Sequence, residues 1–195
     1  RIGRGGLTAS AGYRTYDGFD LDKGTKLQTT GQPASKFKTA GLNGDLKLSD
    51  MLLARFVGNY SRRNIDNYYF AGATQLSSSV YNSVRKLTRY TISPELDFLP
   101  TPDTAFNLSY TYGHYERLET QIYTARTSVV APWLEDNREF HATGRQAFRA
   151  FGQEHYLQAG YEFRRESLER ASIRSVTGLG KATRDLNVGW AQQEL

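Results

Sequence analysis

Aspartates occur close together in two polar segments of this 195-residue chain. Asp17, Asp20 and Asp22 fall within the stretch DGFDLD, and Asp66 lies in a second segment. Carboxylates at such spacing offer the hard oxygen ligands that calcium binds. The stretch lacks the full spacing of a calcium-binding loop, so solvated acids that open a turn are the alternative. Both interpretations stay open: a calcium site formed by these four residues, or acidic turns without a metal.

Aromatic side chains occur among polar residues in segments of the same kind. They are Tyr68, Tyr69, Phe70, Tyr123 and Trp133. Exposed aromatic rings beside polar groups suit the capture of a bulky ligand. The alternative is that these rings only pack one loop against its neighbours. We expect them to form a ligand-binding surface on extracellular loops.

Residues for bond-making chemistry are sparse. The chain has no cysteine, which excludes a catalytic thiol, a disulfide and a cysteine-based zinc site. The three histidines, His114, His141 and His155, are far apart in sequence, and the glycines show no phosphate-loop spacing. We therefore predict no enzymatic activity, and no cofactor apart from the calcium considered above.

The formal net charge is +5, from 25 Lys and Arg against 20 Asp and Glu. Basic proteins often bind nucleic acid, but here the basic residues are scattered over the whole chain and accompany no recognition motif. No nucleic-acid partner is expected. Arg62, Arg63, Arg164 and Arg165 are instead expected at an outer rim, where they would meet lipopolysaccharide phosphates or an anionic substrate.

An alternation of apolar and polar residues predicts the elements that carry these groups. In the stretch GLNGDLKLSDMLLARFVGNYSRRN, residues 41–64, the even positions are apolar on both sides of a short polar turn. Strict period two is typical of a strand with one apolar and one polar face. Eight strands are predicted, at residues 5–17, 36–48, 52–63, 84–99, 104–116, 140–151, 156–166 and 182–192.

The connections between these strands alternate in length. The short ones are 49–51, 100–103 and 152–155, and the long ones are 18–35, 64–83, 117–139 and 167–181. Loops this long are uncommon in a compact soluble domain. Outer-membrane barrels, in contrast, have short turns at one end and long loops at the other. The pattern predicts an all-β fold: antiparallel, up-and-down transmembrane β-barrel strands whose apolar face contacts lipid.

Aromatic residues near the strand ends predict two girdles at the membrane surfaces. The expected members are Phe98, Phe106, Tyr156 and Trp190 near the short turns, and Tyr13, Tyr60, Tyr112 and Phe163 near the long loops. Two positions depart from the simple pattern. Pro94 lies in mid-strand, where its missing N–H predicts a bulge or an early strand end. The stretch AFRAF at 147–151 has an aromatic residue on both faces, so the register of its strand is undefined.

The sequence resembles the early barrel of TonB-dependent outer-membrane receptors, in the branch of the vitamin B12, colicin and siderophore receptors. The resemblance rests on GYRTYDGFDLD at 12–22, LNGDLKLSD at 42–50 and SRRNIDNYYF at 61–70, and continues more weakly from TPDTAFNLSYTYGHYE to EHYLQAGYEFRRES. It implies a 22-stranded barrel with a plugged lumen, of which residues 1–195 would be a single segment of about eight strands. The plug domain and the TonB-binding segment are not present in it.

The same resemblance implies a function. The whole protein would bind a scarce nutrient, such as a metal chelate or a corrinoid (cobalamin), and import it across the outer membrane of a Gram-negative bacterium. TonB would supply energy through the missing plug, and outer-membrane lipid and lipopolysaccharide would surround the barrel. The alternative is a self-contained eight-stranded outer-membrane barrel, either a structural or adhesive protein or a small lipid-modifying enzyme.

Overall fold

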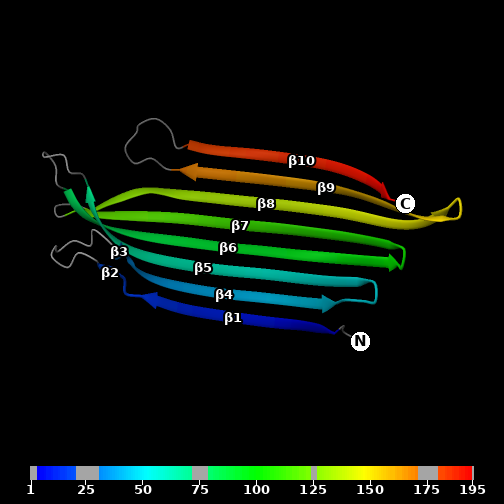
Figure 1. Ribbon diagram of the computed structural model, residues 1–195, viewed down its shortest axis with the longest axis horizontal. Helices are drawn as coiled ribbons and strands as arrows, with labels where there is room; N and C mark the ends of the chain where they lie inside the picture. Colours follow the sequence, from blue (N-terminus) through cyan, green and yellow to red (C-terminus); the bar gives the residue numbers. More distant parts are fainter. Residues whose placement is uncertain (1–3, 21–30, 72–78, 124–126, 171–179, 195) are drawn as a thin grey trace.

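The computed structural model of the chain describes residues 4–20, 31–71, 79–123, 127–170 and 180–194. Its main element is one antiparallel sheet of eight strands (Figure 1). These strands are β1 (Gly5–Tyr16), β4 (Ala34–Lys47), β5 (Leu52–Ala71), β6 (Ser79–Thr101), β7 (Thr104–Tyr123), β8 (Thr127–Ala150), β9 (Gln153–Arg170) and β10 (Gly180–Glu194). A small ribbon is formed by β2 (Phe19–Asp20) and β3 (Gly31–Gln32).

Every strand of the large sheet pairs with its neighbours in sequence, in the order β1-β4-β5-β6-β7-β8-β9-β10. The predicted all-β fold of eight antiparallel, up-and-down strands is therefore confirmed. The edge strands β1 and β10 do not pair with each other within the described ranges, so the sheet is open (Figure 1). The structure thus does not show the closed eight-stranded barrel that the alternative requires.

The strands are longer than the sequence pattern predicts. β5 continues to Ala71 and β6 begins at Ser79, inside the predicted loop 64–83. β7 and β8 likewise occupy most of the predicted loop 117–139. The prediction of long loops there was wrong, because the apolar residues of these strand ends do not follow the strict alternation that marks a half-buried strand.

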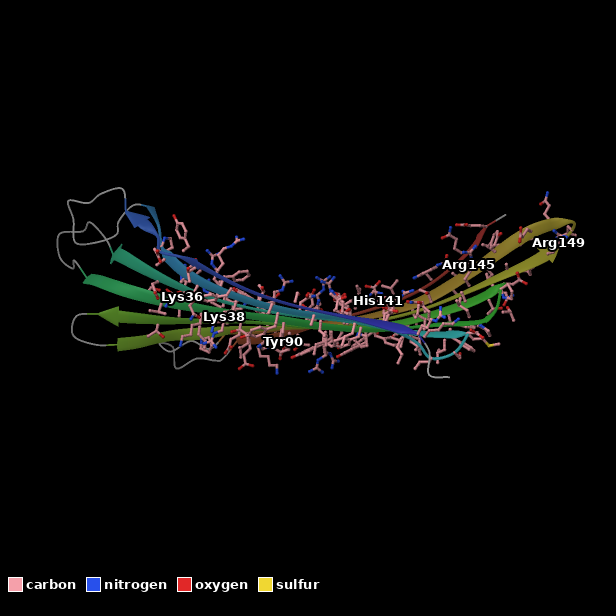
Figure 2. All side chains as sticks on the ribbon, turned by 90° about the horizontal axis from the view of Figure 1, so that it is seen from below. Lys36, Lys38, Tyr90, His141, Arg145 and Arg149 are labelled. Carbon is pink, nitrogen blue, oxygen red and sulfur yellow. The ribbon has the colours of Figure 1, made fainter. Side chains whose placement is uncertain are left out.

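The register places most of the apolar residues of β1 and of β4 to β9 on one surface, here called the apolar face. Leu42, for example, lies opposite Ala9 on β1 and opposite Gly58 on β5. The other surface carries most of the charged residues and is called the polar face. Figure 2 shows the sheet edge-on as a thin, curved layer, with Tyr90 on one surface and His141 on the other.

Within the residues that the structure describes, no other layer covers either face of the sheet. No hydrophobic side chain is buried among the described residues, and Leu7, Leu108 and Leu157 keep exposed fractions of 75%, 43% and 46%. A soluble fold places its large apolar side chains in a core. A continuous exposed apolar surface instead marks contact with a membrane or another protein.

β6 passes through Pro94 without a change of register toward either neighbour. The predicted bulge or early strand end at this proline was therefore wrong. Ser93 and Pro94 have no backbone partner on β7. At this place the side-chain hydroxyls of Ser93 and Thr111 form a hydrogen bond of 3.1 Å. The register shift of this hairpin lies instead between Phe98 and Thr101.

The strand β8 keeps its register to Ala150, which resolves the position that the stretch 147–151 left undefined. Phe151 and Gly152 connect it to β9, with φ angles of 53° and 79°. Two positive φ angles in a two-residue loop define a type I′ turn. The predicted turn at 152–155 was wrong, because residues 153–155 already belong to β9.

Phe151 is fully exposed, so no packing offsets its left-handed backbone. That conformation costs a residue with a branched or bulky side chain about 1–2 kcal/mol, whereas asparagine tolerates it. We expect Phe151→Asn to raise the free energy of unfolding by about 1 kcal/mol relative to Phe151→Ala. Both variants remove the ring and only asparagine relieves the strain. Equal midpoints in urea for the two variants would contradict the expectation.

In the edge strand β10, most apolar residues lie on the opposite face of the sheet from those of its neighbour β9. Its apolar residues Leu186, Val188 and Trp190 lie opposite polar-face positions of β9. The Trp190 indole occupies the space above Gly160, where a Cβ atom would lie 2.7 Å from the ring. On the apolar face, Asp185 accepts hydrogen bonds of 2.8 and 2.7 Å from Arg165. These two contacts hold the observed register.

Of the four aromatic residues predicted to form a girdle near the short turns, only two lie on the apolar face. Phe98 and Phe106 stack on the apolar face, with ring centroids 6.2 Å apart. Trp190 and Tyr156 lie on the polar face, where the Arg145 guanidinium is 4.7 Å from the Tyr156 ring centroid. The alternation of β9 itself places Tyr156 on the polar face, next to the apolar position Leu157. The face of Trp190 depends on the register of β10 with β9, which the spacing within β10 does not contain.

Candidate functional site

A band without charged residues crosses the apolar face. On β6 it runs from Tyr90 to Phe98, and the positions of this face between them are Ile92, Pro94 and Leu96. The eight residue-to-residue steps from Tyr90 to Phe98, at about 3.3 Å each, span about 26 Å along the strand. Outer-membrane barrels carry an outward apolar band about 25 Å tall. The band has the dimensions of a lipid-facing surface.

The end of the band away from the short turns carries a row of tyrosines. Tyr60 lies opposite Tyr90, and the rings of Tyr90 and Tyr112 are 5.8 Å apart. Tyr13 and Phe163 lie on the same face, within one step of this row along their strands. The register therefore confirms that the four residues of the girdle predicted near the long loops share the apolar face.

The polar face holds ion pairs at several levels. Near the short turns, Arg55 contacts Glu95 at 3.0 Å and Asp97 at 2.7 Å, and Asn107 donates hydrogen bonds to both carboxylates. Cross-strand pairs of opposite charge stabilise a sheet by a few tenths of a kcal/mol to about 1 kcal/mol each. This surface is organised for a polar environment.

A second cluster lies on the polar face of β8 and β9. Arg164 contacts Glu139 at 3.2 Å and Glu166 at 2.7 Å. His141 lies between Glu139 and Glu162, at 3.9 Å from each. Carboxylates outnumber cations in this part of the surface, so it favours cationic or hydrogen-bond-donating groups.

A third cluster, the Glu119 cluster, consists of Ser83, Arg85, Arg117 and Glu119 near the long ends of β6 and β7. Glu119 accepts hydrogen bonds from Arg85 (2.9 Å), Arg117 (2.9 Å) and Ser83 (3.0 Å). Ser83 is completely buried and Glu119 is 8% exposed. Burial would raise the pKa of the Glu119 carboxyl, but hydrogen bonds from Arg117, Arg85 and Ser83 outweigh it and hold the pKa below its ordinary value.

A polar hollow lies between the Glu119 cluster and the edge strand β1. Its lining includes Ser10, Thr39, Gly41, Asn59, Ser61, Arg89 and Thr91, and it encloses about 400 Å³ of space open to solvent. Gly41 keeps it open, because a Cβ atom there would lie 2.7 Å from the Ser10 hydroxyl oxygen. Hydroxyl and amide groups beside one guanidinium suit a hydroxylated or anionic ligand. This hollow is the candidate binding site.

The predicted ligand-binding aromatics lie on strands rather than on loops. Tyr68, Tyr69 and Phe70 belong to the end of β5, Tyr123 ends β7, and Trp133 lies on β8. The register brings Tyr69 and Tyr123 to opposite sides of Tyr81, so three tyrosines follow one another across β5, β6 and β7. Their loop placement was wrong, and their role in ligand binding stays a prediction.

The predicted calcium ligands are spread over several elements. Asp17 follows β1, Asp20 belongs to β2, and Asp66 lies on β5 opposite Ala34. Asp22 lies outside the described residues. Within the described part of the chain, no group of three or more His, Cys, Asp or Glu residues is placed to hold a metal ion. The calcium site remains a prediction.

The four rim arginines do not form one group. Arg62 and Arg165 lie on the apolar face, and Arg63 and Arg164 on the polar face. Arg164 and Arg165 are engaged in the ion pairs described above. Only Arg62 and Arg63 make no ion pair within the residues that the structure describes, so they alone fit the predicted role of anion contacts.

A hydrogen-bonded histidine was missed by sequence reasoning. His114 Nδ1 lies 2.7 Å from Asp136 Oδ1, and Tyr112 donates a hydrogen bond of 2.8 Å to the same oxygen. The His114 ring also stacks on Tyr90, with centroids 4.8 Å apart. The group lies at the outer row of the apolar face. Only the register of β7 with β8 brings these residues together, so neither strand pattern alone reveals them.

Among the described residues, no helix has the length and apolar character required to cross a membrane. Comparison of the sequence with known protein families gave no match, and comparison with curated proteins gave none either. The fold is similar to that of the ferric preacinetobactin receptor BauA from Acinetobacter baumannii, with a TM-score of 0.53 and 11% sequence identity. The similarity covers 96% of this chain and 34% of the receptor, so the chain spans about a third of that protein's length.

Proposed function

We propose that the chain is a β-barrel segment of an outer-membrane receptor that takes up a scarce nutrient such as a metal chelate in a Gram-negative bacterium. The observation that carries the proposal is a coreless sheet with an uncharged apolar band on one face and ion pairs on the other. Such a sheet is stable only where one face meets lipid and the other meets water or polar protein.

Further strands would complete the wall on both open edges, since unpaired strand edges are not tolerated within lipid. The similarity over about a third of a ferric-compound receptor supports a larger barrel of this type. In this proposal a plug fills the lumen against the polar face, TonB supplies energy through the plug, and the polar hollow contributes to the wall of the ligand path. The 22-stranded count, the plug and TonB belong to the proposal.

The lipid-facing surface is tested by paired cysteine substitutions in the full-length protein. Leu108 lies on the apolar face and its neighbour Ser109 on the polar face. We expect Leu108→Cys to react with a lipid-soluble maleimide and to resist a water-soluble one, and Ser109→Cys to show the reverse. Equal reaction of both variants with the water-soluble reagent would refute the assignment of the apolar face to lipid.

The transport function is tested in cells that lack the gene. We expect these cells to lose uptake of a ferric chelate or a corrinoid, and cells without TonB to show the same loss. Reconstituted protein should conduct few ions without TonB, because the lumen is plugged. Ligand-independent conductance at full strength would identify an open porin instead and would refute the receptor proposal.

A further inference from the structure

Four basic residues form a patch on the apolar face, just beyond its tyrosine row. This outer basic patch consists of Lys36, Lys38, Arg62 and Lys86, and all four side chains are exposed. Cross-strand partners share one face of a sheet. Lys38 lies opposite Arg62, and Asn64 lies between Lys36 on β4 and Lys86 on β6. The patch therefore covers three adjacent strands.

The position of the patch relative to the apolar band is fixed by contacts with the tyrosines. Lys38 Nζ lies 5.9 Å from the ring centroid of Tyr13. Arg62 is two residues beyond Tyr60, the tyrosine that closes the band on β5. Tyrosine rings occupy the headgroup level of a membrane, and basic side chains reach past them to the headgroup phosphates.

The positive charges of the patch are not compensated by the protein. None of the four residues forms an ion pair within the described part of the chain. The acids nearest to the patch on this face, Asp66 on β5 and Glu116 on β7, each lie two residues from a direct strand partner of Lys86 and also form none there. Like charges directly opposite on neighbouring strands destabilise a sheet. An arrangement that places Lys38 against Arg62 is explained by an anionic partner outside the chain.

Strands β7 to β10 provide an internal comparison on the same face of the sheet. On the same face of β9 and β10, Arg165 is paired with Asp185 at 2.7 Å. On β7 and β8, the Arg138 guanidinium lies 5.7 Å from the Tyr112 ring, and that tyrosine donates to Asp136. At this level a carboxylate thus compensates Arg165 on β9, whereas Arg138, like Lys38, contacts a tyrosine ring and forms no ion pair within the described residues. The outer basic patch differs in placing four such cations on three adjacent strands.

We propose that the outer basic patch binds the phosphate groups of an outer-leaflet glycolipid of the lipid A type. The proposal rests on the lipid-facing assignment of the apolar face made above. Arg62 offers the planar fork that binds a phosphate through two hydrogen bonds, and the three lysines add point charges around it. A bound phosphate group at this place would neutralise the repulsion between Lys38 and Arg62.

The test uses the full-length protein in nanodiscs of phosphatidylcholine, titrated with bisphosphorylated lipid A and with the same lipid lacking its phosphates. We expect the phosphorylated lipid to bind at least about tenfold more tightly. Lys38→Gln with Arg62→Gln should remove most of that preference. Lys47→Gln with Arg149→Gln is the matched control, because it makes the same chemical changes near the short turns.

Equal binding of the two lipids, or an unchanged preference in the Lys38/Arg62 variant, would overturn the proposal. Displacement of the lipid by millimolar inorganic phosphate would also overturn it, since the site would then be a free-anion site. The cysteine labelling at Leu108 separates this result from the proposed function. If Leu108→Cys behaves as lipid-exposed while the patch shows no phosphate preference, the patch inference fails alone.

Discussion

Replacement of Phe56 by arginine is expected to lower the free energy of unfolding in lipid by about 2–4 kcal/mol. Phe56 lies opposite Pro94, in the middle row of the uncharged band. A guanidinium at this depth must leave water without a counter-ion, and the rows of Tyr90 and Phe98 that border the band are two steps away on either side. Unfolding in urea from phospholipid vesicles, followed by tryptophan fluorescence, measures the change.

The adjacent residue supplies the control for this experiment. Val57 lies on the polar face at the same level and is 41% exposed. Val57→Arg introduces the same charge and should cost less than about 1 kcal/mol, because its side chain stays among polar groups. Phe56→Leu measures the loss of the ring without the charge. Equal costs for the two arginine variants would show that the two faces share one environment and would contradict the lipid-facing band.

The second large effect is expected at the Glu119 cluster. Glu119→Gln leaves Arg85 and Arg117 beside each other without the carboxylate that both contact. Removing one member of a largely buried charged group costs about 2–3 kcal/mol, because the remaining charges have lost their partner. Glu116→Gln is the matched control, since Glu116 lies on the same strand and the opposite face. We expect it to change stability by less than about 0.5 kcal/mol.

The cost of Glu119→Gln should depend on pH. The folded-state pKa of the carboxyl lies below the ordinary value of 4.5. Its stabilising contribution is therefore complete at neutral pH and is lost as the pH falls through that lowered pKa. The difference in stability between wild type and variant should shrink in acid below pH 4.5 and stay constant between pH 6 and 8. A difference that grew in acid would show that the carboxyl is not held ionised by the arginines.

Sequence periodicity predicted the strands best where one face is apolar. Leu42, Leu96 and Leu108 mark the band, and the strands around them were identified with the correct face. The pattern stopped near Arg63 and Glu116, although β5 and β7 continue for eight and seven residues more, to Ala71 and Tyr123. Hydrophobic contrast reports a change of solvent across a sheet and not the hydrogen-bonded ladder itself. Sequence periodicity therefore does not detect a strand segment that has the same solvent on both faces.

The clusters of the polar face could not be predicted for a different reason. Period two tells which face a residue occupies, but not which residue of the next strand lies opposite. Arg85 lies opposite Glu119 only because the register shifts between Phe98 and Thr101. Without that irregularity, each residue of β6 would face a partner one position farther along β7. The ion pair of Arg85 with Glu119 thus depends on a local feature near the turn, which begins at Phe98, 13 residues from Arg85 along the chain.

The strictly sequential pairing of the eight strands has a consequence for how the protein is made. Each strand pairs with the strand just before or just after it, so once a turn has formed, each further pair of residues closes only a short additional loop of chain. Low contact order favours rapid formation and allows the sheet to grow one hairpin at a time. At each stage the newest strand is a template for the next, and β10 in its observed register is such a template. In the proposed barrel, synthesis and insertion of the wall would proceed in the same direction, with long-range pairing needed only at the final closure.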